Sequence, residues 1–464
     1  MGAGKSRRVG RVLADNPRRL DLTNSTDCKG DVIFDERAAM TTDYAFTMDT
    51  SSIKVGPGVT REIGDDMRRL GCSRVLVMTD PIIAELAPVA IVCESLSEAG
   101  VEFAIYDRVR VEPTDVSLKD ATAFMAEGKF DGIVAVGGGS TIDTAKAANL
   151  YSTYPTDLLT YVNPPIGQGK PVPGPLKPLV AIPTTAGTGS ETTGAAIFDY
   201  LEMRAKTGIA HRELRPSLGI VDPDNTRTMP PLVAAATALD VLSHAVESLT
   251  ALPFHEREAP ETPSLRPAYQ GSNPISDVWS ERAITLVAAN LVQAMEHPED
   301  DEARMNMMLA ATFAGIGFGN AGVHLPHGMS YPVSGMVRDY HPAGYPADHP
   351  IVPHGISVIL NAPAVFRFTA KANPERHLHA ASLLGVETEG VDPADAGDVL
   401  ADGIIAIMRK TGMPNGLGAI GFTPDDVDTL VAGTMPQHRV TKLSPRPASE
   451  DNLRKLFLDA MSYW

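Results

Sequence analysis

The sequence predicts an α/β domain built on a mostly parallel sheet, followed by an all-helical domain. Between residues 42 and 225, short β-rich runs alternate with helical patterns, which is the rhythm of strand–helix–strand crossover units. After Asp222 the pattern changes to long Ala- and Leu-rich helical stretches that contain no convincing strand. We therefore predict a short flexible N-terminal segment at 1–41, an α/β domain at 42–225 and a helical domain at 226–464.

Four apolar runs in the first domain are typical of buried parallel strands, because they are continuous rather than alternating. An amphipathic segment from Ala90 to Ala99, closed by Gly100, predicts a helix between the first two. A second helix is expected at 141–148. The predicted strands cover 74–79, 102–106, 132–136 and 179–182.

In the second domain, Pro230-Pro231 indicates a helix start, and the segment 232–249 is largely apolar. The stretch from Met305 to Val337 carries no Asp, Glu, Lys or Arg, but polar residues and Pro326 interrupt it. We expect it to be buried core that ends in a site, with a helix broken at Gly315-x-Gly317-x-Gly319. The Pro-rich segment 253–274 is interpreted as a long surface or active-site loop.

Composition excludes several classes of protein. With 464 residues, 43% of them hydrophobic and 21% charged, the chain has enough apolar material for large cores. A net charge of −17 argues against nucleic acid and anionic membranes as partners. Cys28, Cys72 and Cys93 form no CxxC pair, which indicates a reducing compartment. The first 19 residues are basic, as in a transit peptide or a disordered tail.

A first glycine loop, Gly137-Gly138-Gly139-Ser140, lies between a predicted strand and a predicted helix. Glycines let the backbone approach a phosphate, and the start of a helix offers free N–H groups, so the loop predicts an anion site. Ser140 and Asp143 are expected to form a capping box. The alternative is an ordinary tight turn, since the loop lacks the GxGxxG fingerprint.

A second loop, 183–191, also follows a predicted strand and is rich in hydroxyl groups and glycines. Two such loops at adjacent strand ends indicate a dinucleotide. Asp80 ends another strand, where a carboxylate would accept hydrogen bonds from ribose hydroxyls and repel a 2′-phosphate, which favours NAD(H) over NADP(H). The alternative for Asp80 is a helix cap. The predicted cofactor-binding residues are Asp80, Gly137, Gly138, Gly139, Ser140, Asp143, Thr184, Thr185, Thr188, Ser190 and Lys206.

Asp240 and His244 lie four residues apart on the apolar helix and therefore share one face. A buried carboxylate without a partner is costly, and a bound cation would offset that cost. His327 and His354 stand in uncharged, turn-like contexts. One Asp and three His suit Fe(II) or Zn(II). The alternatives are that each histidine is a satisfied core residue, or that the ligands include His324 or His349.

Together these motifs resemble the iron-containing, group III alcohol dehydrogenases. The resemblance covers the chain from about residue 42 and includes Gly137–Ser140, Gly187–Glu191 and the histidine motifs. It implies the dehydroquinate synthase-like architecture, with a nicotinamide-binding α/β domain, a helical domain and a metal between them. It also implies Fe(II) as the metal, with Zn(II) as the alternative. The implied ligands are Asp240, His244, His327 and His354.

Three segments, 266–274, 319–325 and 327–332, resemble one subgroup of that family, which passes a hydride from a hydroxyacid to an oxoacid through a tightly bound nicotinamide. The resemblance implies 4-hydroxybutyrate and 2-oxoglutarate as substrates. Tyr331 stands where many members carry a second histidine that is thought to relay a proton, so we expect Tyr331 and His327 to be catalytic. The substrate carboxylates need a cation, for which the candidates are Arg266, Lys442 and Arg446; the alternative is that these are surface charges.

The expected partners are small hydroxyacids and oxoacids, with the chain as a homodimer or higher homo-oligomer. We expect the cytoplasm for a bacterial chain and the mitochondrial matrix for a eukaryotic one. An NAD-dependent alcohol or 4-hydroxybutyrate dehydrogenase on the same scaffold is the nearest alternative. A metal-dependent hydrolase would leave both glycine loops unexplained. A binding protein without catalysis is the third alternative.

Overall fold

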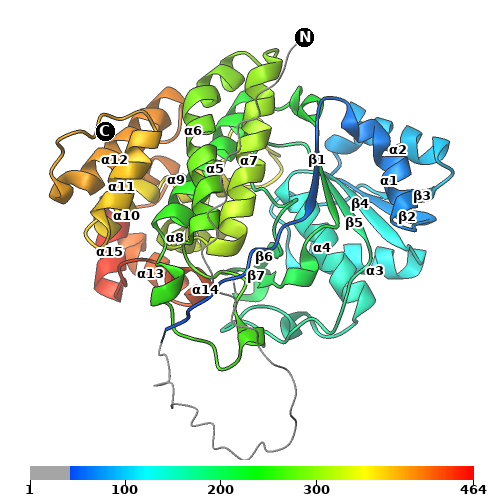
Figure 1. Cartoon of the computed structure of the whole chain (residues 1–464), viewed down its shortest axis with the longest axis horizontal. Coiled ribbons are helices and arrows are strands. Elements are labelled where there is room, and N and C mark those ends of the chain that lie inside the picture. Colours follow the sequence, from blue (N-terminus) through cyan, green and yellow to red (C-terminus); the bar gives the residue numbers. More distant parts are fainter. Residues whose placement is uncertain (1–41, 204) are drawn as a thin grey trace, which may run out of the picture. The chain divides into compact units, whose positions relative to one another are not determined.

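The computed structural model describes residues 42–203 and 205–464. Strands and α-helices alternate as far as Pro183, and three further strands follow as far as Val221. From Pro231 onward every named element in the described part of the chain is a helix (Figure 1). The α/β and helical parts are thus confirmed in the predicted order. The N-terminal segment 1–41, with its basic residues and Cys28, lies outside the described residues.

The main sheet has six strands, and every neighbouring pair is parallel. All four predicted strands are present within a residue or two of the expected bounds, and two further strands complete the sheet. Because β4 and β5 are neighbours, the two glycine loops that follow them lie at the same edge. In sheet order the strands are β1 (Ser52–Val55), β8 (Leu218–Val221), β5 (Leu179–Pro183), β4 (Gly132–Gly137), β2 (Arg74–Met78) and β3 (Glu102–Tyr106).

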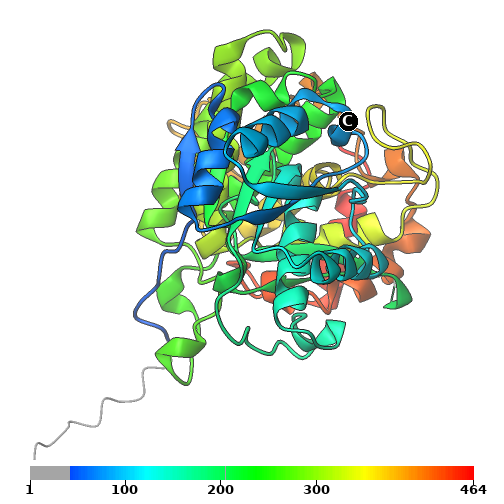
Figure 2. The same cartoon turned by 90° about the vertical axis from the view of Figure 1, so that its right-hand side faces the viewer.

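Helices cover both faces of this sheet, as seen edge-on in Figure 2. Alternate side chains of β2 enter two separate cores: Val75 and Val77 pack on one face, whereas Leu76 and Met78 pack on the other. This arrangement explains the continuous apolar runs in the sequence. The helices are α1 (Ile63–Arg69) and α2 (Ala87–Glu98) on the first face, and α3 (Asp115–Gly128) and α4 (Gly139–Thr153) on the second.

A separate antiparallel hairpin, β6 (Ala195–Tyr200) and β7 (Ala205–Ala210), follows the second glycine loop. The expectation of a mostly parallel sheet did not include it. Strand β6 packs on α4, and β7 packs on α8 (Leu325–Gly335) of the helical part. The hairpin therefore joins the two parts of the fold and places Lys206 between them.

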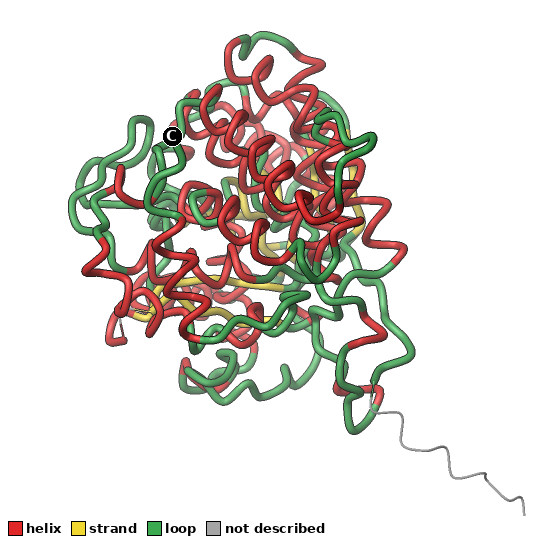
Figure 3. Tube along the Cα trace, turned by 90° about the vertical axis from the view of Figure 1, so that its left-hand side faces the viewer, coloured by secondary structure: helices red, strands yellow, loops and turns green. Residues whose placement is uncertain are grey.

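The helical part is built around α5 (Pro231–Thr250), which contacts α6, α7 and α9. Helix α5 is long and apolar enough to cross a membrane, but 83% of its most apolar window is buried inside the protein. It is therefore a core helix. Figure 3 shows the molecule from the side of the helical part, where helices predominate. The other α-helices of this part are α6 (Pro274–Glu296), α7 (Asp301–Ala321), α8, α9 (His354–Ile359), α10 (Ala362–Thr369), α11 (Pro374–Leu383), α12 (Ala396–Lys410), α13 (Val427–Thr434), α14 (His438–Thr441) and α15 (Glu450–Asp459).

The predicted helix break at the three glycines of α7 is wrong, because the helix runs through them to Ala321. A Cβ on Gly315 would lie 2.7 Å from the carbonyl oxygen of Gly189, and a Cβ on Gly319 would touch Thr193. Gly315 and Gly319 therefore allow the second glycine loop and the residues just after it to pack directly on α7. The chain turns instead at Gly322, where φ is +96°, and α8 leaves at an angle of 104°.

Candidate functional site

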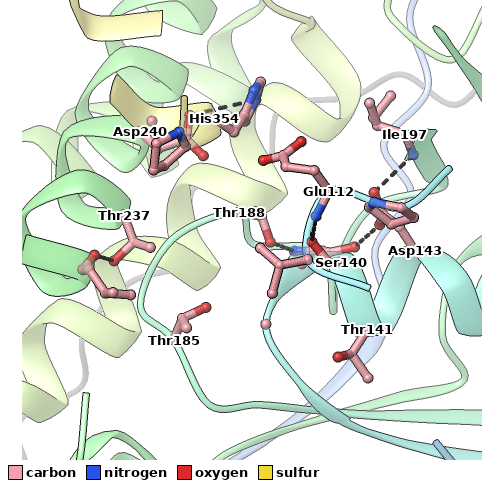
Figure 4. A pocket seen from close by; sticks show the side chains of 18 of the residues that line it. Glu112, Ser140, Thr141, Asp143, Thr185, Thr188, Ile197, Thr237, Asp240 and His354 are labelled. Atoms are coloured by element: carbon pink, nitrogen blue, oxygen red, sulfur yellow. Dashed lines mark hydrogen bonds and ion pairs between the residues drawn. The ribbon is translucent and has the colours of Figure 1, made fainter. Parts of the chain in front are cut away.

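A cavity of about 330 Å³ lies between the carboxyl ends of β4 and β5 and the helices α5, α8 and α9. Both glycine loops line one side of it, and the predicted metal ligands line the other. Figure 4 shows Asp240 and His354 across the cavity from Ser140 and Asp143. Apart from Gly137, every predicted cofactor-binding, metal-binding and catalytic residue lines this one cavity.

The two glycine loops pack against each other, which explains the small residues. A Cβ on Gly139 would lie 2.5 Å from the Thr188 side chain, and a Cβ on Gly138 would lie 3.3 Å from Thr185. Gly137 is the last residue of β4 and does not line the cavity. Its carbonyl accepts a hydrogen bond from the Thr184 backbone, and a Cβ there would collide with Thr141.

The predicted capping box is wrong. Helix α4 begins at Gly139, and its cap position has no side-chain hydrogen bond. Instead, Ser140 Oγ accepts a hydrogen bond from the Glu112 backbone, and Asp143 accepts one from Ser190 Oγ at 2.6 Å and one from Ile197 N at 2.9 Å. Both side chains therefore connect neighbouring segments of the cavity wall rather than cap the helix.

Lys146, which the sequence analysis did not select, anchors the second glycine loop through hydrogen bonds. Its ammonium donates to Ser190 Oγ at 2.6 Å and to the carbonyl of Ala195 at 2.9 Å, and lies 3.5 Å from Asp143. Burial lowers the pKa of Lys146 to about 8, and the Asp143 carboxylate opposes this shift. Nothing in the sequence pattern of α4 distinguishes this lysine from a surface one.

Asp80 follows β2 and lines the cavity. Its Oδ1 accepts hydrogen bonds from the backbone of Ile82 and Ile83, so it also holds the turn, as the capping alternative expected. Burial raises the pKa of Asp80, and these backbone donors oppose the rise. The two interpretations of Asp80 are therefore compatible.

Lys206 lies at the cavity wall with its ammonium between two carboxylates, 2.6 Å from Glu112 and 3.0 Å from Asp199. These carboxylates raise the pKa of Lys206 despite its burial. Its charge is more than neutralised by its own neighbours. Glu112 itself lines the cavity and has a positive φ of 55°.

The four predicted metal ligands come from three helices and meet at one point. One ligand atom from each of Asp240, His244, His327 and His354 lies within 4.8 Å of the others. Asp240 Oδ1 is 3.7 Å from His327 Nε2 and 3.8 Å from His354 Nε2, and its Oδ2 is 3.8 Å from His244 Nδ1. These distances are too long for hydrogen bonds.

The four side chains therefore do not satisfy one another's hydrogen-bonding capacity. Asp240 Oδ1, His244 Nδ1 and His327 Nε2 are buried and have no hydrogen-bond partner among the described residues. Burial raises the pKa of Asp240 well above its usual range and lowers the pKa of His327 to about 3. The imidazoles are thus neutral and keep their lone pairs, which fits a bound divalent cation.

Glu247 was missed by the sequence analysis, although it lies one turn after His244 on the same face of α5. It is fully buried. Its Oε1 is 2.6 Å from His327 Nδ1, and its Oε2 accepts a hydrogen bond from the His324 backbone at 2.6 Å. Burial raises its pKa to about 7.

The two competing histidines do not belong to the cluster. His324 Nε2 is hydrogen-bonded to Thr250, on the far side of Glu247. His349 is paired with Asp348 at the surface.

None of the three predicted substrate cations lines the cavity. Arg266 is paired with Asp43, Arg446 packs over the Phe368 ring, and Lys442 is exposed. These candidates came from segments without a periodic pattern, where sequence gives no direction for a side chain. The cavity instead contains Arg439, whose Nη2 donates to the Tyr331 hydroxyl at 2.8 Å.

Comparison with known proteins agrees with this geometry. The family model described as iron-containing alcohol dehydrogenase matches residues 50–223, and the C-terminal model of the same family matches residues 268–461. The chain belongs to the iron-containing alcohol dehydrogenase family. It is therefore an oxidoreductase. Both glycine loops lie in the first matched range and His327 and His354 in the second, whereas Asp240 and His244 lie between the two ranges.

Within the iron-containing alcohol dehydrogenases, the chain is 55% identical over 426 residues to a Bos taurus protein named "Hydroxyacid-oxoacid transhydrogenase, mitochondrial", covering 91% of each. Its fold matches a solved 1,3-propanediol oxidoreductase with a TM-score of 0.79 and 28% identity, over 90% of this chain and all of the other. A sulfoacetaldehyde reductase from Bifidobacterium kashiwanohense, solved in complex with NAD+, matches with a TM-score of 0.72 and 26% identity, over 91% and 99% of the two chains.

Proposed function

We propose that this enzyme transfers a hydride from 4-hydroxybutyrate to 2-oxoglutarate through a tightly bound nicotinamide, the reaction of a hydroxyacid-oxoacid transhydrogenase. The observation that carries the proposal is that the metal-binding cluster and both glycine loops line one cavity. The close similarity to the Bos taurus protein of that name supports the choice of reaction.

Asp240, His244, His327 and His354 would hold an Fe(II) ion, with Zn(II) as the alternative for this donor set. The ion would supply a Lewis acid for the substrate oxygen, and the nicotinamide would accept and return the hydride. A bound divalent ion would favour the ionised form of Asp240, which with three neutral histidines would be the one charge among the four ligands, so the ion would keep its electrophilic character.

The glycine loops would hold the cofactor. The backbone at Gly138 and Gly139, together with the Thr185 and Thr188 hydroxyls, forms a wall without bulky side chains, which suits a pyrophosphate. Asp80 would bind the ribose hydroxyls, and its negative charge disfavours the 2′-phosphate of NADP(H).

The two half-reactions balance without free nucleotide. 4-Hydroxybutyrate loses a hydride and a proton to give succinic semialdehyde, and 2-oxoglutarate takes up a hydride and a proton to give 2-hydroxyglutarate. We assign Tyr331 the role of holding a proton beside the reacting oxygen. Burial raises the pKa of Tyr331, so the phenol keeps its proton at neutral pH.

The test is turnover by extensively dialysed enzyme with both substrates and no added nucleotide. We expect 2-hydroxyglutarate over many cycles with ping-pong kinetics, and deuterium from carbon 4 of 4-hydroxybutyrate on carbon 2 of the product. Strict dependence on added NAD, with labelled NADH accumulating in solution, would instead establish a plain NAD-dependent dehydrogenase.

We also propose a domain boundary near residue 225, a homodimer or higher homo-oligomer, and the mitochondrial matrix as the compartment of a eukaryotic chain. The word "mitochondrial" in the name of the Bos taurus protein supports the compartment. Size-exclusion chromatography with light scattering tests the oligomer, and a monomer would refute it.

A further inference from the structure

Arg439 is a cation in the cavity wall, contributed by the short helix α14. Its guanidinium carbon lies 5.0 Å from the centre of the Tyr269 ring, and its Nη2 donates to the Tyr331 hydroxyl. Its Nη1 is buried and has no hydrogen-bond partner among the described residues. Two aromatic side chains therefore hold the guanidinium in place without satisfying it.

No carboxylate in the described part of the chain forms an ion pair with Arg439, although 32 pairs link other residues. Lys206, the other cation at the cavity wall, is held by Glu112 and Asp199. The charge of Arg439 at the cavity wall is therefore not paired with a carboxylate among the described residues. A buried, unpaired charge is costly, and a guanidinium binds a carboxylate with two parallel hydrogen bonds.

The position of Arg439 relative to the metal-binding cluster determines which part of a bound substrate it can contact. Its partner Tyr331 lies one turn of α8 after His327, a rise of about 6 Å. In 4-hydroxybutyrate, three carbon–carbon bonds of about 1.5 Å separate the carboxylate from the carbon that loses the hydride. A substrate with its hydroxyl group at the cluster can therefore place its carboxylate near Arg439.

We propose that Arg439 binds the substrate carboxylate remote from the reacting carbon, and that it selects hydroxyacids over uncharged alcohols. This inference rests on the proposed function for its substrates. It replaces Arg266, Lys442 and Arg446, which lie outside the cavity, as the source of the required cation.

The kinetic test compares 4-hydroxybutyrate with the uncharged 4-hydroxybutyramide on native enzyme and Arg439→Gln. We expect the variant to lose roughly 10- to 100-fold in kcat/KM for the acid, mainly through KM, and to change little for the amide. Arg439→Lys should recover part of the loss. Arg446→Gln, which removes an arginine outside the cavity, is the matched control and should behave as native. An equal loss for acid and amide would overturn the proposal.

A binding measurement separates this proposal from the proposed function. Titration calorimetry with butyrate and butyramide needs no turnover and uses the whole metal-loaded protein. We expect butyrate to bind native enzyme and Arg446→Gln, and to bind Arg439→Gln at least 10-fold more weakly. If butyrate binds all three proteins equally, or none, Arg439 is not the anchor. If it binds as expected but 4-hydroxybutyrate is not oxidised, only the proposed reaction fails.

Discussion

Glu247 Oε1 lies 2.6 Å from His327 Nδ1, and the two side chains are fully enclosed. When Glu247 is ionised, its carboxylate can only accept, so Nδ1 carries the hydrogen and Nε2 presents its lone pair to Asp240 and the metal-binding cluster. Carboxylates in this outer position fix both the tautomer and the ring orientation of a ligating histidine. Glu247 is thus a positioning residue for His327.

This relationship predicts the effect of Glu247→Gln. The amide has nearly the same shape but accepts through one atom only, so it cannot serve both His327 Nδ1 and the His324 backbone. We expect roughly 10- to 100-fold weaker metal affinity, measured by competition with a chelator. Glu281→Gln, which loses a surface pair with His379, serves as the control. Unchanged metal affinity would show that the hydrogen bond does not orient the ring.

The ligand assignment predicts that His244→Ala and His327→Ala retain the fold but lose the metal. Each substitution removes one of the four donor atoms and leaves a coordination position without a protein ligand, which weakens metal binding. Elemental analysis of the purified variants measures the metal, and circular dichroism measures the fold. The exposed His255→Ala should hold as much metal as the native protein. Full metal occupancy in either ligand variant would contradict the assignment.

Asp80 tests the cofactor preference. Asp80→Asn keeps an oxygen that accepts from the backbone of Ile82 but removes the charge. We expect roughly 10-fold weaker binding of NAD(H), while binding of NADP(H) stays the same or tightens, because the repulsion of the 2′-phosphate is lost. Fluorescence titration of both reduced cofactors measures the ratio, with the exposed Asp107→Asn as control. An equal loss for both cofactors would remove Asp80 from the ribose site.

The α/β order, the four predicted strands and the pair of Asp240 and His244 were predictable because each leaves a local pattern, whereas the resemblance to the family was needed to choose His327 and His354 over His324 and His349. Buried parallel strands are continuous apolar runs, and Asp240 and His244 share a helix face through their spacing. Arg439 leaves no such pattern, because its position depends on the packing of α14 on α8. The three glycines of α7 misled the sequence interpretation, since each allows a close contact with a segment distant in the sequence: Gly315 with Gly189, Gly317 with Ser280 and Gly319 with Thr193.

His377 predicts a dependence of stability on pH. It is buried, its Nδ1 donates to the Asn373 carbonyl at 2.7 Å, and burial lowers its pKa to about 4. Below pH 6.5 the unfolded chain takes up a proton that the folded chain refuses, so stability is lost as pH falls from 6.5 toward 4. His377→Gln has no group that titrates at this position, so it does not lose stability in this way. The difference in melting temperature between His377→Gln and the native protein should therefore shrink as the pH falls from 7.5 to 5, whereas the difference for His255→Gln should stay constant. A constant gap between His377→Gln and native would contradict the prediction.

Tyr331 predicts how the reaction type changes with the proton donor. Its phenol is buried beside Arg439 and keeps its proton at neutral pH, whereas an imidazole there would exchange one more readily. Tyr331→His should therefore raise oxidation of 4-hydroxybutyrate by free NAD several-fold. The gain should be largest below pH 7, because the Arg439 charge would lower the pKa of the new histidine. Tyr331→Phe, which removes the proton altogether, should show no gain. If Tyr331→His also shows none at any pH, this position does not set the reaction type.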